Sequence, residues 1–136
     1  MSKNLFFIER NKNNNTVHYD IEPSRSNAIN AYWIINNKYH EALNFIEKQM
    51  AYGFTLTPTS FDDYIYTMKM NALPLKKIFI KSDCAEMYIK NELCILKKIY
   101  VQATENFIGY PTVEYIDIYG INKHNILIKE RVTNYK

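Results

Sequence analysis

The sequence opens on an apolar run, LFFIER at residues 5–10, followed by NKNNN at 11–15 and TVHYDIE at 16–22. The two outer segments are rich in β-branched and aromatic residues, and the Asn-rich segment between them favours a turn. The stretch therefore predicts a β-hairpin. Four consecutive apolar residues cannot all lie on one face of a strand, so both faces of its first strand must be covered. Glu9 and Arg10 follow directly and point to opposite faces, so we expect both side chains to be partly buried.

Segments typical of short strands recur along the rest of the chain, with turn residues between them. One segment differs: residues 40–52 have a helical period, with an apolar stripe that includes Leu43 and Met50. Asn36 and Asn37 offer an N-cap for this helix, and Gly53 offers its end. The further predicted strands are residues 31–35, 54–57, 63–70, 77–81, 86–90, 94–104, 113–119 and 126–133.

About nine or ten antiparallel strands with one amphipathic helix near residues 40–52 favour a mainly β fold, an antiparallel β-barrel, because closure removes exposed strand edges. A barrel-like sandwich with the helix packed on one side is the alternative. The length of 136 residues predicts a single domain, residues 1–136, which buries about two-thirds of its unfolded surface.

Composition narrows the classes of partner. A net charge of +3 with scattered Lys residues does not indicate a nucleic-acid-binding protein. The chain contains no apolar segment of transmembrane length and no visible signal peptide, so we expect a cytoplasmic protein, or a periplasmic or secreted one if a leader has been trimmed. Cys84 and Cys94 have no metal-site spacing and do not face each other in their predicted hairpin, which predicts two reduced thiols.

Several stretches resemble an uncharacterised bacterial family, the domain of unknown function 4833. They are FIERNKN at residues 7–13 with Val17, Tyr19 and Asp20 after it, AYWI at 31–34, LNFIE at 43–47 with AYG at 51–53, and VEYIDIYG at 113–120. The resemblance spans nearly the whole chain. It implies no activity, because the family has no assigned function, and it implies secretion signals that this chain lacks.

The polar end of the first hairpin is the first candidate site. In one register Arg10, His18 and Asp20 share a face, and in a register slipped by one residue Glu9 lies opposite His18. Either register places a His beside a carboxylate and an Arg near the buried middle of the strand. The functional interpretation is a clamp for an anion or a polar headgroup, with Arg10 as a bidentate donor. The structural alternative is a salt bridge that closes the hairpin.

Aromatic residues form the second candidate site. Tyr32 and Trp33 lie on one predicted strand, and Tyr115 and Tyr119 share one face of another. Such rings could line a ligand cavity or stack on bases, and core packing is the alternative. Asp117 and the charged run at residues 129–131 belong to a solvated face unless the barrel is hollow.

Enzyme signatures are sparse. There is no nucleophile elbow and no glycine-rich phosphate loop, and the three His residues are too dispersed to suggest a metal site. We therefore expect no cofactor and no metal. Three hypotheses follow, in order: a non-enzymatic module that binds a small amphipathic or anionic ligand, a protein-interaction or structural module that uses a Tyr-rich sheet face, as a homo-oligomer or with another protein, and a hydrolase or isomerase that uses His18 with a carboxylate. The ligand-binding residues predicted by the first are Glu9, Arg10, His18, Asp20, Tyr32, Trp33, Tyr115 and Tyr119.

Overall fold

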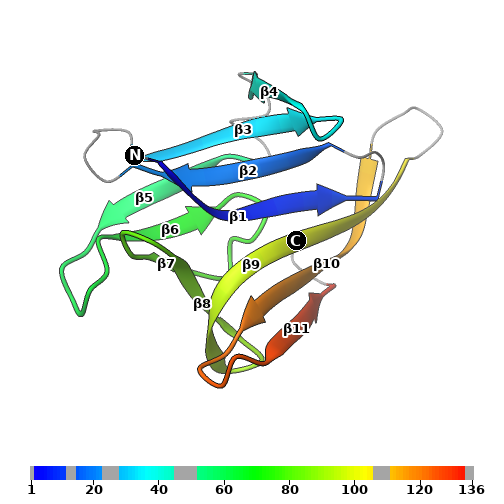
Figure 1. Ribbon diagram of the computed structural model, residues 1–136. Coiled ribbons are helices and arrows are strands. Elements are labelled where there is room, and N and C mark those ends of the chain that lie inside the picture. Colours follow the sequence, from blue (N-terminus) through cyan, green and yellow to red (C-terminus); the bar gives the residue numbers. More distant parts are fainter. Residues whose placement is uncertain (1, 12–14, 23–27, 45–51, 106–110, 134–136) are drawn as a thin grey trace.

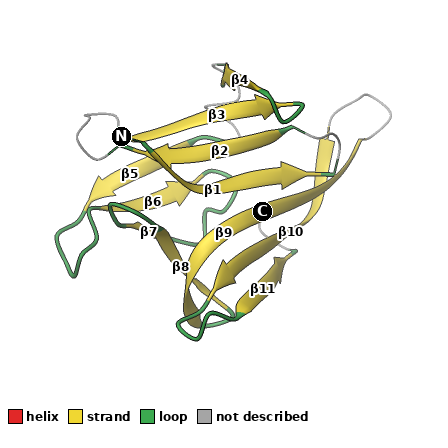
Figure 2. Ribbon diagram, viewed as in Figure 1, coloured by secondary structure: helices red, strands yellow, loops and turns green. Residues whose placement is uncertain are grey.

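The computed structural model describes residues 2–11, 15–22, 28–44, 52–105 and 111–133. Within these residues the chain forms eleven β-strands and no helix (Figure 1, Figure 2). Each of the ten predicted strands overlaps an observed one, and the eleventh is β4. The strands are β1 (Lys3–Arg10), β2 (Thr16–Ile21), β3 (Ile29–Ile35), β4 (Tyr39–Ala42), β5 (Phe54–Pro58), β6 (Tyr66–Met70), β7 (Ile78–Ile80), β8 (Ala85–Ile89), β9 (Glu92–Glu105), β10 (Pro111–Ile121) and β11 (Leu127–Val132).

All eleven strands belong to one sheet that is organised around β9. The main strand order is β4-β3-β2-β1-β9-β8-β7-β6-β5, and β10 and β11 branch from the other edge of β9. Ile95 of β9 pairs with Glu86 of β8 on one edge and with Ile121 of β10 on the other. Further along β9, Lys98 pairs with Phe7 of β1. The edge of β9 opposite β10 thus carries two four-stranded wings, β1–β4 and β5–β8, as Figure 1 shows.

The sheet forms an open half-barrel, so the prediction of a closed barrel is wrong. The terminal strands of the main order, β4 and β5, are not paired with each other. Both are short, at four and five residues, and short edge strands limit the backbone that is left unpaired. The prediction of a wholly antiparallel sheet is also wrong, because β1 and β9 are parallel.

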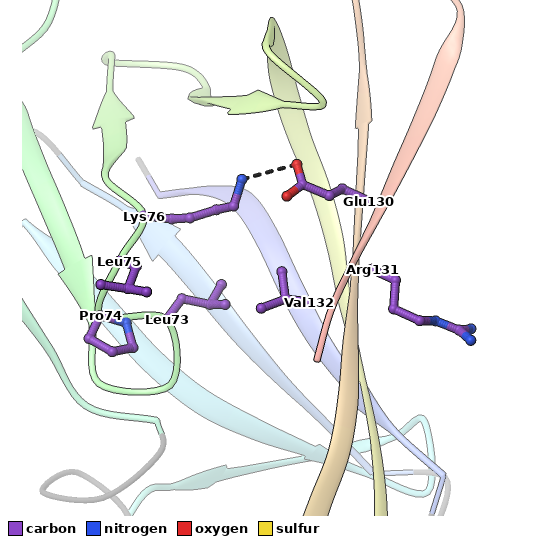
Figure 3. A pocket seen from close by; sticks show the side chains of 7 residues that line it. All are labelled: Leu73, Pro74, Leu75, Lys76, Glu130, Arg131 and Val132. Atoms are coloured by element: carbon purple, nitrogen blue, oxygen red, sulfur yellow. Dashed lines mark hydrogen bonds and ion pairs between the residues drawn. The ribbon is translucent and has the colours of Figure 1, made fainter. Parts of the chain in front are cut away.

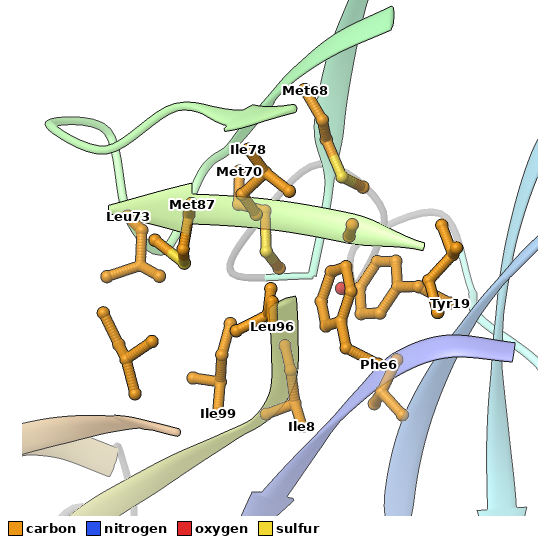
Figure 4. Close-up of a cluster of buried hydrophobic side chains, with 14 of the residues drawn as sticks. Phe6, Ile8, Tyr19, Met68, Met70, Leu73, Ile78, Met87, Leu96 and Ile99 are labelled. Carbon is orange, nitrogen blue, oxygen red and sulfur yellow. The ribbon is translucent and has the colours of Figure 1, made fainter. Parts of the chain in front are cut away.

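The core fills the space between the two wings (Figure 4). Its centre is a stacked pair, Phe6 and Tyr19, with ring centroids 4.8 Å apart. The Tyr19 hydroxyl donates a 2.8 Å hydrogen bond to the carbonyl of Tyr52, and burial raises the pKa of Tyr19. Complete burial of one large apolar side chain contributes about 1.5–3 kcal/mol to folding. The second wing and β9 contribute the buried side chains Met68, Met70, Ile78, Met87, Leu96 and Ile99.

The predicted helix at residues 40–52 is not present in the part of the chain that the structure describes. Asn36 and Asn37 have φ values of 51° and 61°, and two successive residues in this left-handed region form a tight hairpin turn and not a helix N-cap. The chain then returns along β3 as β4, with Ile35 opposite Tyr39. Leu43 is buried in the core, and residues 45–51 of the predicted helix lie outside the described residues.

Two smaller predictions concern the thiols and the membrane. Cys84 and Cys94 are both free, as predicted, and burial raises the pKa of each thiol. No helix in the described part of the chain is both long and apolar enough to cross a bilayer.

Candidate functional site

The register of the first hairpin differs from both predicted registers. A β-bulge between Asn4 and Phe6 shifts β1 against β2, so that Phe7 lies opposite His18 and Glu9 lies opposite Thr16. Because side chains alternate along a strand, this register places Arg10 on the inner face with Phe6. His18 and Asp20 lie on the outer face. The bulge therefore separates Arg10 from the His and the carboxylate that were predicted to share its site.

Arg10 packs against two rings at the inner face of β1. Its guanidinium carbon lies 5.1 Å from the Trp33 ring centroid and 5.9 Å from that of Tyr52. The two rings meet edge to face at 5.3 Å. Arg10 Nε is buried and has no hydrogen-bond partner among the described residues. The guanidinium is thus drawn toward the interior, as predicted, and cation–π contact with aromatic faces holds it there.

Four rings form a ladder across the outer face of the first wing. Phe7 stacks on His18 at 5.1 Å between centroids, His18 on Tyr32 at 5.9 Å, and Tyr32 on His40 at 4.9 Å. The ring planes differ by 16–25°. These four residues, one from each of β1, β2, β3 and β4, are called the ring ladder. Side chains at neighbouring positions on adjacent strands lie close enough for such stacking.

Polar groups fix the orientation of the ladder. The Asn4 amide nitrogen donates to Asp20 Oδ1 at 2.9 Å, and the Tyr32 hydroxyl donates to Asp20 Oδ2 at 2.8 Å. Asn4 Nδ2 also lies 3.3 Å from His18 Nδ1, and Thr16 Oγ1 lies 2.9 Å from His18 Nε2. Because an amide nitrogen only donates, His18 accepts at Nδ1 and donates from Nε2 to Thr16.

Burial controls the protonation of the two central rings. It lowers the pKa of His18, since a partly buried imidazolium loses hydration; nearby Asp20 opposes this effect, and His40 reinforces it. Burial, followed by the hydrogen bond to Asp20, raises the pKa of Tyr32 to about 12. At neutral pH both groups are therefore uncharged, so the centre of the ladder presents neutral rings.

A hollow of about 440 Å³ adjoins the ladder beside Tyr32. It lies where β4 ends at Ala42, opposite Tyr32, so that within the described residues no strand pairs with the start of β3 on that side. Two acidic residues, Asp20 and Glu41, are among those that line it. Strand register places Asp20 on the face of Tyr32, and Glu41, opposite Trp33, on the other face. We call it the outer hollow, and its lining residues are Ser2, Asp20, Asn30, Ala31, Tyr32, His40, Glu41 and Ala42.

Comparison with known protein families identifies the family of this chain. The model of the domain of unknown function DUF4833 matches residues 6–131. The chain belongs to the DUF4833 family. No curated protein and no solved structure matches it. The match includes the whole ring ladder, so the ladder lies within the DUF4833 domain, whereas Asn4 lies just before the matched residues.

The other predicted tyrosines lie at a different place on the DUF4833 domain. Tyr115 and Tyr119 are on the outer face of β10, on either side of Asp117, a buried carboxylate that pairs with the exposed Arg131. Asp117 is 3% exposed, and Arg131 donates to its two oxygens at 2.9 and 3.0 Å. The Arg131 guanidinium lies 3.7 Å from the Tyr115 ring centroid. The hydrogen bonds from Arg131 hold the pKa of Asp117 below its usual range.

Glu9 also lies away from the outer hollow. Its Oε1 is 3.5 Å from Lys98 Nζ, and the same ammonium group lies 4.7 Å from the Tyr119 ring centroid. The DUF4833 fold thus places two of the eight predicted ligand-binding residues at the outer hollow, Asp20 and Tyr32. His18 lies behind Tyr32 in the ring ladder and does not line the hollow. Arg10 and Trp33 lie on the inner face, and Glu9, Tyr115 and Tyr119 lie on β1 and β10 beside β9.

Sequence reasoning missed Asn4, His40 and Glu41. His40 and Glu41 fell in the segment interpreted as a helix, where they could not be aligned with Tyr32. The Asn36-Asn37 pair was a usable signal, because consecutive Asn residues favour hairpin turns with positive φ. No local signal marked Asn4, since its contact with Asp20 depends on the bulge in β1.

A second hollow, of about 280 Å³, lies between the turn that precedes β7 and the strand β11 (Figure 3). Leu73, Leu75 and Val132 contribute its apolar wall. Two basic residues line it. Lys76 pairs with Glu130 at 3.0 Å, as the dashed line in Figure 3 marks, and Arg131 pairs with Asp117. Glu130 also accepts a hydrogen bond from the backbone of Lys90. A charged ligand would have to displace this pairing, so the outer hollow is the stronger candidate site.

Proposed function

We propose that this DUF4833 domain is a non-catalytic binding module whose outer hollow takes a small, ring-bearing ligand with hydroxyl or amine donors. The observation that carries the proposal is the meeting of a flat ring pair with the carboxylate of Asp20 in one hollow. Tyr32 and His40 stack at 4.9 Å and both line the hollow. Asp20 lines it on the same face as Tyr32, and carboxylates accept hydrogen bonds from ligand hydroxyl or amine groups.

The charge of the hollow favours a neutral or cationic ligand over an anion. No Lys or Arg is among the described residues that line it, and the carboxylate of Asp20 would repel a negative group. This choice replaces the anion clamp expected from Arg10, whose guanidinium is on the other face of the sheet and packs on Trp33 and Tyr52.

The same geometry argues against a catalytic role for His18. Both ring nitrogens have partners, Asn4 and Thr16, and both ring faces are covered, by Phe7 and Tyr32. A general base needs a nitrogen that can reach the proton of a substrate. His18 is better suited to hold Tyr32 in place than to exchange protons with a bound molecule.

Titration by nitrogen-15 NMR tests the proposal, with D-glucose, D-glucosamine and D-glucuronate as probes. We expect glucose or glucosamine to shift the backbone amides of residues 30–32 and 40–42, and glucuronate to have a weaker effect. Tyr32→Ala should abolish the shifts, because it removes the ring that supports His40 and the hydroxyl that holds Asp20. Tyr39→Ala is the matched control, since Tyr39 is an exposed tyrosine next to His40 but does not line the hollow. If none of the three sugars perturbs these amides, the proposal fails.

A further inference from the structure

An apolar band crosses the outer face of β7, β8, β9, β10 and β11. Strand register places Phe79 opposite Glu86, Glu86 opposite Ile95, Ile95 opposite Ile121 and Ile121 opposite Leu127. A parallel row pairs Tyr88 with Leu93. At the β7 end, Phe61 meets Phe79 edge to face at 6.2 Å. The apolar band is defined by Phe61, Phe79, Tyr88, Leu93, Ile95, Ile121 and Leu127.

The band gathers most of the exposed large apolar side chains of the described residues. Seven such side chains are exposed, and four of them belong to the band: Phe61 at 50%, Tyr88 at 55%, Leu93 at 40% and Leu127 at 62%. A half-exposed side chain of this size leaves on the order of 100 Å² of apolar surface in water. Together they reach the size of patch that marks a contact surface in soluble proteins.

The charge within the band is already neutralised. Glu86 lies between Phe79 and Ile95 in the registered row. Its Oε2 is 3.5 Å from Lys81 Nζ, and its Oε1 accepts a hydrogen bond from the Tyr64 hydroxyl. When two copies of the band meet, the two Glu86 carboxylates therefore bring their own counter-charge. The like-charge repulsion that would oppose self-association is weakened.

We propose that a second copy of this chain covers the apolar band, face to face about a two-fold axis. A two-fold contact uses the same patch on both copies, so it requires only a surface that is complementary to itself. Stable dimers bury roughly 800 Å² on each subunit. The exposed apolar side chains supply the centre of such an area, and the polar residues around them supply the rim. Two sheet faces then pack as they do in a β-sandwich.

Dimerisation through the free edge of β11 is the competing geometry, and its charges oppose it. A two-fold axis perpendicular to the sheet pairs residues that point to the same face. Two antiparallel registers pair most of one β11 with the β11 of the second copy. One places Lys129 opposite Lys129 of the second copy, and the other places it opposite Arg131 of that copy. Like charges directly opposite each other destabilise strand pairing. The face is therefore the favoured contact.

Light scattering coupled to size-exclusion chromatography, over a range of concentrations, tests the proposal. We expect wild-type protein to show twice the mass of one chain, and Tyr88→Glu and Leu127→Glu each to halve it. Tyr39→Glu is the matched control: Tyr39 is 64% exposed but lies on β4, and this variant should remain a dimer. A wild type that is monomeric at every concentration would overturn the proposal. A monomer whose band binds a different protein would overturn it as well. A dimer that survives both band substitutions would also overturn it.

Hydrogen exchange supplies a measurement that does not depend on the variants. In the wild type, the amides of residues 86–95 should exchange more slowly as the concentration rises, while those of residues 39–42 should not change. Equal behaviour of the two segments counts against the proposal. The band consists of Phe61 and residues of β7–β11, whereas the outer hollow is lined by Ser2 and residues of β2–β4. Because no residue belongs to both, the failure of one proposal leaves the other untouched.

Discussion

The hydroxyl of Tyr32 donates a 2.8 Å hydrogen bond to Asp20 Oδ2 across the neighbouring strands β2 and β3. The same carboxylate accepts from Asn4 on β1. A single acidic side chain thus joins three strands at the outer hollow. Its hydrogen bond to the hydroxyl also fixes the orientation of the Tyr32 ring.

Tyr32→Phe tests what this hydrogen bond contributes. The substitution keeps the ring and its stacking but leaves one oxygen of Asp20 without its donor, so the free energy of unfolding should fall by about 1 kcal/mol. Urea unfolding measures the change. Tyr39→Phe is the control, because the exposed Tyr39 should tolerate loss of its hydroxyl. A loss as large in Tyr39→Phe as in Tyr32→Phe would contradict the assignment.

His18 should make the stability of the protein depend on pH. Its pKa is lowered in the folded protein, so below about pH 6.5 the unfolded chain takes up a proton more readily than the folded one. Stability should be constant with respect to this group above that pH and should decrease as the pH falls toward the lowered pKa. Urea unfolding at several pH values measures the trend. His18→Gln should flatten it, and an unchanged slope in that variant would assign the trend to other groups.

Gly120→Ala tests the close approach of β10 to β9. A Cβ at this position would lie 2.5 Å from Ile89 Cδ1 and 2.8 Å from the Ile95 carbonyl oxygen. The side chain of Ile89 can shift, but the backbone of β9 cannot, so we expect a loss of about 1–3 kcal/mol, typical of overpacking. Thermal unfolding measures it against Thr112→Ala, an exposed position on the same strand. A variant as stable as the wild type would show that the two strands can separate at low cost.

Asp117→Asn tests the ion pair between the buried Asp117 carboxylate and the exposed Arg131 on the outer face of β10. The amide keeps the shape of the side chain but removes the charge that binds Arg131 and Lys129. Hydrogen bonds to charged groups are stronger than neutral ones, so the free energy of unfolding should fall by about 2 kcal/mol at neutral pH. Because the pKa of Asp117 is lowered in the fold, its contribution is present above about pH 4 and is lost as the pH falls through the lowered pKa. The difference between wild type and Asp117→Asn should therefore shrink in acid, and a difference independent of pH would refute the ion-pair origin.

The candidate site shows where sequence reasoning stops. Alternation in TVHYDI predicted that His18 and Asp20 share one face of the strand, and in β2 these two are half-buried while Val17 and Tyr19 on the other face are buried. The faces of β1 were not predictable to the same degree. Four apolar residues in a row show no alternation, so they do not reveal the bulge between Asn4 and Phe6. A bulge shifts every later residue of the strand by one place. For this reason Arg10 exchanged faces with Glu9 relative to the predicted site.

The sequence alone determined the positions of ten strands and the burial alternation of β2, because period-two patterns and turn residues are local properties. It also pointed to Arg10 as a residue held near the interior. Only the tertiary structure decided that β9 carries two wings on one edge, that the half-barrel stays open, and that residues 39–42 form a strand beside Tyr32. These outcomes depend on pairings between distant segments. The side-chain pattern of a strand does not determine which other strand its backbone will pair with.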